Sequence, residues 1–467
     1  MPKLDRRQVL GALAAGTLPE ALIASAAQNT RTAAAAAKLA APDMRPNTLV
    51  ILLEDLRWDA LGCTGHPFVK TPNIDRIARE GARFDNAFTT TPLGSPARAT
   101  FLTGQWAHQH EIRNNGENGP TSMRLKSFPL LQQQAGYETA FIGKWHMGSD
   151  DTPRPGFDRW VGLKGQGQYV NPVLNLDGRP APQAGYLTDL LNAQAVEFIR
   201  RRRGKPFSLV LSHKAAQGPF IAPERHRTLF ANDAIRHAAS SSDSLEGKPA
   251  LRRALAGNPQ PLRPPTDEAI RQQLQCLTSV DEGLGRIFAT LDEIRQTDNT
   301  FIVFASNNGS FWGEHGLSDK RAAYEESIRI PLLMRYPKLI RPGTRLRNYV
   351  LNTDLASTMV EISRSNPVPE MKGRSLVPLL EGRARDWRRS FLCEYFEEPT
   401  FPRIPSWQAI RTERWKYIRY TNIDGMDEIY DLASDPGEVR NLLSDAATQS
   451  ALDDCREDMA RLWRETF

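Results

Sequence analysis

The chain has 467 residues, of which 40% are hydrophobic, and this apolar content excludes a disordered or fibrous protein. Its net charge of +6 includes +3 from residues 1–41, and the remaining +3 is too small to indicate nucleic-acid binding. Four cysteines (Cys63, Cys276, Cys393 and Cys455) are too few for a disulfide scaffold and lack metal-site spacing. No apolar run reaches about 18 residues, so no membrane span is expected.

Residues 1–41 are expected to be an export signal followed by a linker. The charged start Asp5-Arg6-Arg7-Gln8-Val9-Leu10 precedes an Ala-rich apolar stretch with small residues near 24–27. Paired arginines before an apolar pair resemble a signal for the twin-arginine export machinery. The alternative is a basic, Ala-rich helix that belongs to the fold. Export predicts a periplasmic or secreted protein, and the twin-arginine route suits a chain that acquires a metal or a modification before it leaves the cytoplasm.

From residue 42 onward, apolar runs alternate with amphipathic stretches. Short apolar runs of this kind predict strands that are buried on both faces. The predicted strands are 48–53, 83–88, 139–142, 207–212, 300–305 and 330–335. The predicted helices are 73–79, 188–202 and 268–294. This order is typical of an α/β fold with a large, mainly parallel sheet between helices. The stretch 231–265, rich in Ser, Pro and Arg, is expected to be a surface insertion.

The pattern changes near residue 386. Short strands with turns between them are predicted at 391–396, 407–411, 415–420 and 428–431, followed by an amphipathic helix at 451–463. We therefore expect three parts: the signal and linker (1–41), the α/β domain (42–385) and a smaller antiparallel sheet-plus-helix subdomain (386–467).

Polar residues follow the predicted buried strands, where open α/β sheets place their ligand sites. Carboxylate and amide oxygens at two strand ends suit Ca²⁺ or Mg²⁺, and the basic residues nearby could converge on a tetrahedral oxyanion. The candidate metal ligands are Glu54, Asp55, Asn307 and Asn308. The candidate anion-binding residues are Arg98, Lys144, His146 and Lys320. Each alone has a simpler interpretation as a helix cap or a solvated side chain, but together they indicate a site.

Five longer motifs occur along the chain in the following order. They are Leu53-Glu54-Asp55-Leu56-Arg57, Gly94-Ser95-Pro96-Ala97-Arg98, Gly143-Lys144-Trp145-His146, Gly313-Glu314-His315-Gly316-Leu317 and Tyr430-Asp431-Leu432. With these motifs the chain resembles the formylglycine-dependent sulfatases of the alkaline phosphatase superfamily, from about residue 45 to residue 443.

The resemblance implies a mechanism and a set of roles. In that family, a Cys or Ser that opens a Cys/Ser-x-Pro-x-Arg motif is oxidised to formylglycine, whose hydrate attacks the sulfur of a sulfate ester. Three aspartates and one asparagine hold the metal, a lysine and a histidine assist the nucleophile, and a second histidine and lysine bind the sulfate. The matching positions are Asp55, Asn308, Arg98, Lys144, His146 and Lys320.

Four positions depart from the family pattern. Gly94 stands at the Cys or Ser, and a glycine can neither be oxidised to formylglycine nor act as a nucleophile. Glu54 and Asn307 stand at two of the ligand aspartates, and Asn307 removes a negative charge, so weak metal binding is expected. Gln217 stands at the sulfate-binding histidine and cannot act as a cation or general acid.

Two hypotheses follow from these departures, beside a third, phosphate-ester chemistry on the same fold, which would need the same missing nucleophile. One is a sulfuric ester hydrolase for sulfated carbohydrate or aryl sulfate, impaired or inactive by the usual route, which would need a modified residue at position 94 or metal–water attack. The other is a non-catalytic pseudo-sulfatase that binds a sulfated small molecule, a sulfated glycan or a protein partner. The mass of the peptide that contains Gly94 distinguishes them.

Overall fold

A computed structural model describes residues 45–201, 203–256, 263–399 and 404–467. The export signal predicted for residues 1–41 therefore lies outside the described residues. The chain from Arg45 to Phe467 forms one compact unit. Within the described ranges, no helix has the length and apolar character needed to cross a lipid bilayer.

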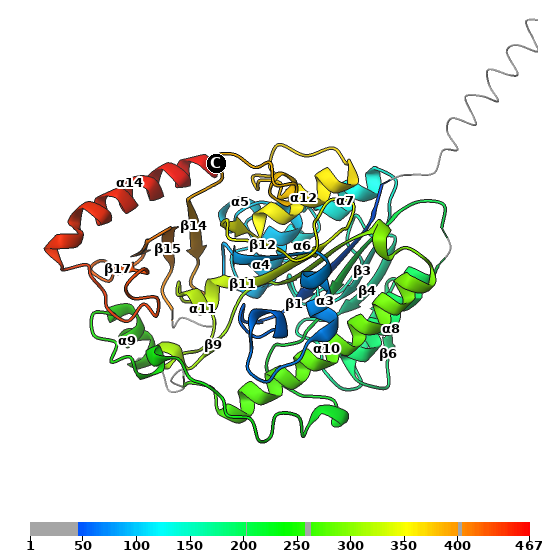
Figure 1. Cartoon of the computed structure of the whole chain (residues 1–467), viewed down its shortest axis with the longest axis horizontal. Helices are drawn as coiled ribbons and strands as arrows, with labels where there is room; N and C mark the ends of the chain where they lie inside the picture. Colours follow the sequence, from blue (N-terminus) through cyan, green and yellow to red (C-terminus); the bar gives the residue numbers. More distant parts are fainter. Residues whose placement is uncertain (1–44, 202, 257–262, 400–403) are drawn as a thin grey trace, which may run out of the picture. The chain divides into compact units, whose positions relative to one another are not determined.

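An 11-stranded sheet lies at the centre of this unit (Figure 1). Its order is β12-β2-β11-β8-β1-β7-β3-β4-β5-β6, and β13 also pairs with β2. The run from β8 to β4 is parallel, whereas β11, β5 and β6 are antiparallel to their neighbours. The strands are β1 (Asn47–Leu53), β2 (Ala82–Phe88), β3 (Glu138–Gly143), β4 (Arg159–Leu163), β5 (Val173–Leu176), β6 (Arg179–Pro182), β7 (Phe207–Ser212), β8 (Thr300–Ser306), β11 (Arg329–Arg335), β12 (Thr344–Leu346) and β13 (Val350–Leu351). The predicted large, mainly parallel sheet is confirmed.

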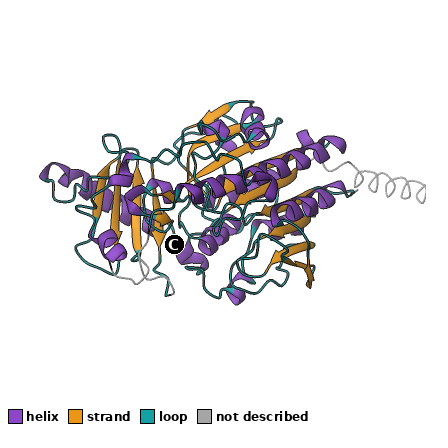
Figure 2. Cartoon of the chain, turned by 90° about the horizontal axis from the view of Figure 1, so that it is seen from below, coloured by secondary structure: helices purple, strands orange, loops and turns teal. Residues whose placement is uncertain are grey.

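Helices cover both faces of this sheet, as Figure 2 shows. The strand β1 is fully buried and its side chains alternate: Leu49, Ile51 and Leu53 pack in one core cluster, and Val50 and Leu52 pack in another. The first cluster includes residues of α3 (Pro72–Glu80), α8 (Leu187–Arg200) and α10 (Asp267–Glu293). The second includes residues of α4 (Gly94–Thr103), α7 (Phe128–Gln134), α12 (Thr353–Ser363) and α13 (Val377–Leu380). The central strands are thus sandwiched between two helical layers, which fixes where their carboxyl ends emerge.

A second, antiparallel sheet follows near the C-terminus. It has the order β14-β15-β16-β17. The bounds are β14 (Ser390–Tyr395), β15 (Trp407–Thr412), β16 (Trp415–Tyr420) and β17 (Glu428–Asp431). The helix α14 (Gln449–Glu465) packs Leu452, Cys455 and Met459 against this sheet. The predicted smaller antiparallel α+β part is confirmed, whereas its boundary at residue 386 stays a prediction.

The expected surface insertion at 231–265 is wrong in its middle. There α9 (Pro249–Ala256) buries Ala250, Leu251 and Ala254 in the core cluster that contains Phe391 and Trp407. The spacing of these three apolar residues gives the short helix one buried face, and the surrounding Arg and Pro residues hide that signal in the sequence. Further short elements are α5 (Ala107–His110), α6 (Gly119–Ser122), α11 (Glu325–Ile328), β9 (Phe311–Trp312) and β10 (Ser318–Asp319).

Candidate functional site

Two neighbouring strands bring the predicted metal ligands together. The strands β1 and β8 pair in parallel with Leu53 opposite Ser306, so Glu54-Asp55 and Asn307-Asn308 follow side by side. Asn307 Nδ2 donates to Glu54 Oε1 (3.1 Å), and Asn308 Nδ2 donates to Asp55 Oδ1 (2.7 Å). The backbone N–H of Asp55 donates to Asn307 Oδ1 (3.2 Å). Four side chains from positions about 250 residues apart therefore form one hydrogen-bonded group.

Glu54 is fully buried and is the point where two cations meet. Arg98 Nη1 on α4 donates to Oε1 (2.6 Å), and Lys144, directly after β3, forms an ion pair with Oε2. Burial alone raises the pKa of Glu54, but the charges of Arg98, Lys144 and Lys320 outweigh it and hold the pKa well below its usual range. Glu54 is therefore a carboxylate that is permanently ionised at neutral pH.

Gly94 is the first residue of α4 and faces this carboxylate. A Cβ at this position would lie 3.2 Å from Glu54 Oε1, 3.4 Å from Asn115 Oδ1 and 3.6 Å from Arg98 Nη1. The adjacent Ser95 is held elsewhere, because its hydroxyl donates to the carbonyl of His146 and its N–H donates to Asn115 Oδ1 (2.9 Å). Ser95 therefore does not present a free hydroxyl in place of the missing side chain.

Lys144 is surrounded by acceptors from three loops. Besides its ion pair with Glu54, its Nζ donates to Gln217 Oε1 (2.5 Å) and to Gln166 Oε1 (2.6 Å). Burial, with the charges of Arg98 and Lys214, lowers the pKa of Lys144 to about 7 against the opposing pull of Glu54. Lys214 also donates weakly to Gln217 Oε1 (3.4 Å). Gln217 thus accepts from two lysines.

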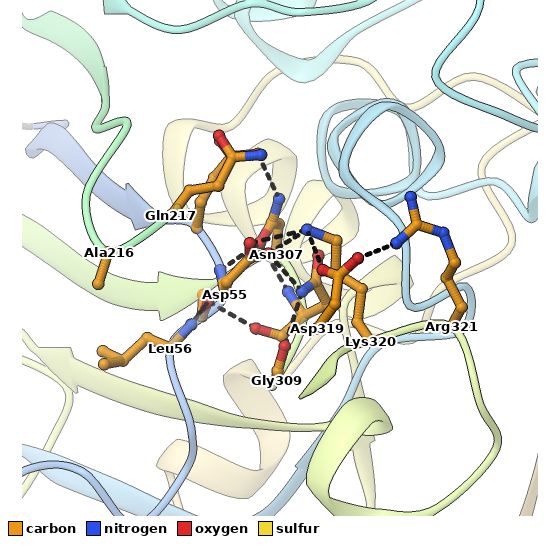
Figure 3. A network of polar contacts seen from close by, with 12 residues as sticks. Asp55, Leu56, Ala216, Gln217, Asn307, Gly309, Asp319, Lys320 and Arg321 are labelled. Carbon is orange, nitrogen blue, oxygen red and sulfur yellow. Dashed lines mark hydrogen bonds and ion pairs between the residues drawn. The ribbon is translucent and has the colours of Figure 1, made fainter. Parts of the chain in front are cut away.

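A chain of alternating charges leads away from Asp55 (Figure 3). Lys320 Nζ lies 2.7 Å from both carboxylate oxygens of Asp55 and 3.3 Å from Asp319 Oδ1. Asp319 also pairs with Arg321, whose Nε donates to Glu398 Oε2 (2.6 Å). Burial, followed by the negative charges of Glu54 and Asp319, raises the pKa of Asp55, although Lys320 opposes this rise. Lys320 is therefore already paired with two carboxylates, those of Asp55 and Asp319.

His146 lies beside this group as a neutral imidazole. His146 is buried, and its backbone φ of 47° lies in the left-handed region. Burial, and then the charge of Lys144, lowers its pKa to about 3. Among the described residues, its Nδ1 has no hydrogen-bond partner, and neither do Nε and Nη2 of Arg98.

A cavity of about 360 Å³ opens next to these residues. Its charged lining is balanced, with Asp55 and Asp319 against Lys320 and Arg321. The rest of its wall combines amide and aromatic side chains, including Asn115, Gln166, Gln217, Phe220, Phe311 and Trp312. Such a mixed wall suits a polar organic ligand better than a bare ion.

The residues at the two strand ends do not fit a divalent cation. Such an ion needs several oxygens free to coordinate it. Every carboxylate oxygen of Glu54 and Asp55 already accepts a hydrogen bond from a cation or an amide, and Asn307 Oδ1 accepts from two backbone N–H groups. Asn308 Oδ1 is the one oxygen of the set that is buried without a partner.

The structure thus groups the predicted positions Glu54, Asp55, Gly94, Arg98, Lys144, His146, Gln217, Asn307, Asn308 and Lys320 around one centre. Sequence reasoning missed the residues that complete it: Asn115, Gln166, Lys214, Asp319 and Arg321. Lys214 and Asp319 lie next to motif residues, so proximity was an available signal. Asn115 and Gln166 lie in turn-rich loops whose composition indicates no chemistry.

Comparisons with known proteins show what the chain is similar to. A sequence model of the sulfatase family matches residues 46–363, and a model described as the C-terminal part of N-sulphoglucosamine sulphohydrolase matches residues 313–465. An N-acetylglucosamine-6-O-sulfatase of Bacteroides thetaiotaomicron is 32% identical, over 86% of this chain and 83% of that protein. An extracellular sulfatase homologue of Drosophila melanogaster is 31% identical over 76% of this chain, which spans 33% of that longer protein.

A solved structure has the same fold. It is 30% identical, with a TM-score of 0.83, and the match covers 90% of this chain and 98% of that one. That protein is described in complex with its substrate, D-glucosamine-2-N,6-O-disulfate.

Proposed function

The chain belongs to the sulfatase family, and we propose that it binds a sulfated sugar without hydrolysing it through formylglycine. The observation that carries this proposal is the glycine at position 94, at the start of α4. Glycine offers no side chain to oxidise, and the hydroxyl of Ser95 donates a hydrogen bond to the carbonyl of His146 and so does not replace it. Loss of a nucleophile that works as part of a unit can lower turnover by about 10⁶.

A glucosamine sulfate is the ligand that we propose. The cavity beside Asp55 offers amide groups, such as those of Asn115 and Gln166, for sugar hydroxyls, and the aromatic Phe220 and Trp312 for the sugar ring. The name of the Bacteroides relative and the disulfated glucosamine in the structural neighbour support this class. A protein partner at the same cavity is the alternative.

No step of this function passes through a metal. We propose that Ca²⁺ or Mg²⁺ binds weakly at most, because Asn307 lacks the charge of an aspartate and the carboxylates of Glu54 and Asp55 are already paired. The residues instead hold one another: Lys320 neutralises Asp55, and Arg98 and Lys144 neutralise Glu54.

Delivery to the periplasm or medium by the twin-arginine machinery is a further part of the proposal. It rests on Arg6 and Arg7, and the extracellular sulfatase among the relatives supports it. Fractionation of cells that express the full chain, beside the Arg6→Lys/Arg7→Lys variant, tests it. Export that is unaffected by this variant would argue against the twin-arginine route.

Three measurements on the purified protein test the binding function. The mass of the peptide that contains Gly94 should equal that of an unmodified glycine. Calorimetry should detect binding of D-glucosamine-2-N,6-O-disulfate but not of D-glucosamine, and an aryl sulfate should not be turned over. Turnover at an enzymatic rate, or a modified residue at 94, would contradict the proposal. Failure to bind the sulfated sugar would favour the protein-partner alternative.

A further inference from the structure

Three of the four positions that depart from the family pattern, Glu54, Asn307 and Gly94, meet at the Glu54 carboxylate, and the fourth, Gln217, is linked to it through Lys144. Glu54, itself a departure, accepts from Asn307 (3.1 Å) and lies 3.2 Å from where a Cβ of residue 94 would stand. It pairs with Lys144, which donates to Gln217 (2.5 Å). We infer that this Glu54-centred network takes the place of the divalent cation, so that the centre is built and held without metal.

The network uses almost every oxygen that a cation would need. Glu54 Oε1 accepts from Arg98 and Asn307, and Oε2 accepts from Lys144. Asp55 Oδ1 accepts from Lys320 and Asn308, and Oδ2 accepts from Lys320. A cation at this place would have to displace several charge-assisted hydrogen bonds, which are the stronger kind.

The orientation of the two amides follows from their neighbours. If the Asn307 amide were turned over, its oxygen would face Glu54 Oε1, and the N–H groups of Asp55 and Asn308 would lose their acceptor. If the Asn308 amide were turned over, its oxygen would face Asp55 Oδ1 and the carbonyl of Gly309. Both amides therefore direct N–H groups, not oxygens, toward the carboxylates.

The charge of the centre also opposes a cation. Two carboxylates, Glu54 and Asp55, face three cations, Arg98, Lys144 and Lys320, and all five side chains are at most 8% exposed. A divalent ion would add two positive charges to a buried set whose carboxylates already have cationic partners. Unpaired charge in a buried site is costly, so the set favours its own cations over an added one.

The length of Glu54 explains the glycine. The extra methylene of glutamate, compared with aspartate, carries Oε1 to within 3.2 Å of the position of a residue-94 Cβ. A Cβ at this distance is tighter than an ordinary contact, so the Glu54 carboxylate would have to shift by a few tenths of an ångström to admit a side chain at 94. Glu54 and Gly94 are therefore matched, because the glutamate carboxylate lies close to the space that a side chain at 94 would need.

Thermal unfolding of the purified chain with EDTA or with Ca²⁺ is the direct test, and it needs no variant. The melting temperature should be the same in both, because ligand binding to the folded state alone would raise it. The variant Glu54→Asp/Asn307→Asp rebuilds the acidic ligands and should gain a Ca²⁺-dependent rise of several degrees. Asp243→Asn, which breaks a buried pair with Lys248 elsewhere, is the matched control and should show no Ca²⁺ response.

A double-substitution cycle tests the pairing of Glu54 with Gly94. Gly94→Cys alone should lower the melting temperature, and it should cost less in the Glu54→Asp background, where the carboxylate is shorter. A Ca²⁺-dependent rise in the unsubstituted chain would overturn metal independence. Equal costs of Gly94→Cys in both backgrounds would overturn the pairing. Neither outcome depends on sugar binding, so the proposed sugar-binding function is tested separately.

Discussion

Lys320 Nζ lies 2.7 Å from both oxygens of Asp55, although the two residues are 265 positions apart. Both side chains are buried. The pair therefore ties the end of β1 to the segment after β10 through charge rather than through apolar packing. Because each charge is desolvated, each needs the other.

Lys320→Met should lower the free energy of unfolding by about 3–5 kcal/mol, because it leaves the Asp55 carboxylate buried without its cation. Denaturant unfolding measures this loss. Lys126→Met is the matched control, since Lys126 pairs with Glu370 (2.5 Å) on the surface, where both side chains are about half exposed. Exposed pairs contribute about 0–1 kcal/mol. Equal effects of the two substitutions would mean that the buried pair stabilises the fold no more than an exposed pair does.

Acid should destabilise the protein below about pH 6.5 through its buried histidines. His110 is buried, its Nδ1 accepts the N–H of Ile112 (3.1 Å), and burial, followed by the charge of His108, lowers its pKa to about 3. Between the unfolded pKa of about 6.5 and about 3, the unfolded chain binds a proton that the folded chain excludes. The contribution of His110 is thus complete above pH 6.5 and is lost as the pH falls, by up to about 1.4 kcal/mol per pH unit.

His110→Gln should flatten this dependence. The measurement is the free energy of unfolding in urea at several pH values between about 7 and 4. His237→Gln is the control, because the His237 ring is 41% exposed. The slope with pH, rather than the absolute stability, carries the result, since either substitution can change packing. An unchanged slope for His110→Gln would mean that His110 accepts a proton in the folded state.

Leu251→Ala should lower the free energy of unfolding by about 2–5 kcal/mol, although the sequence predicted a surface insertion for this segment. Leu251 on α9 is 1% exposed and belongs to the core cluster that contains Trp407. Leu255→Ala on the same helix is the control, because Leu255 is only partly buried against that cluster. If both substitutions lower the free energy of unfolding by the same small amount, α9 does not pack in the core and the predicted surface insertion is correct.

The sequence predicted the large sheet because its central strands carry long apolar runs. Residues 48–53 and 300–305 are buried on both faces, and their length matches β1 and β8 within one residue at each end. The short strands β5 and β6 and the helix α9 were not predicted, because none of them carries a continuous apolar run.

The sequence likewise predicted one part of the site and not another. Its strand-end residues, such as Asp55 and Asn307, were predictable because parallel strands place their ends together. The pairing itself was not: nothing in the sequence says that Lys320 binds Asp55 or that Glu54 faces Gly94. Those contacts depend on how far each side chain reaches after the fold has formed. Gln166 and Asn115 were missed for the same reason, since they act through position and not through a motif.

Gly94→Cys rebuilds the Cys-x-Pro-x-Arg motif, but it should not restore sulfatase turnover by itself. The new side chain meets Glu54, and Asn307 and Gln217 still lack the charges that the family pattern has at their positions. Each missing donor to a developing charge typically costs about 10²–10³ in rate. The set Gly94→Cys, Glu54→Asp, Asn307→Asp and Gln217→His should therefore exceed the single variant by far more than tenfold on an aryl sulfate, because the residues act as a unit. Both variants are made in a host that converts the cysteine to formylglycine, with conversion confirmed by mass. If the single variant matches the full set, Gly94 is the sole lesion, and the substitutions at 54, 217 and 307 are compatible with catalysis.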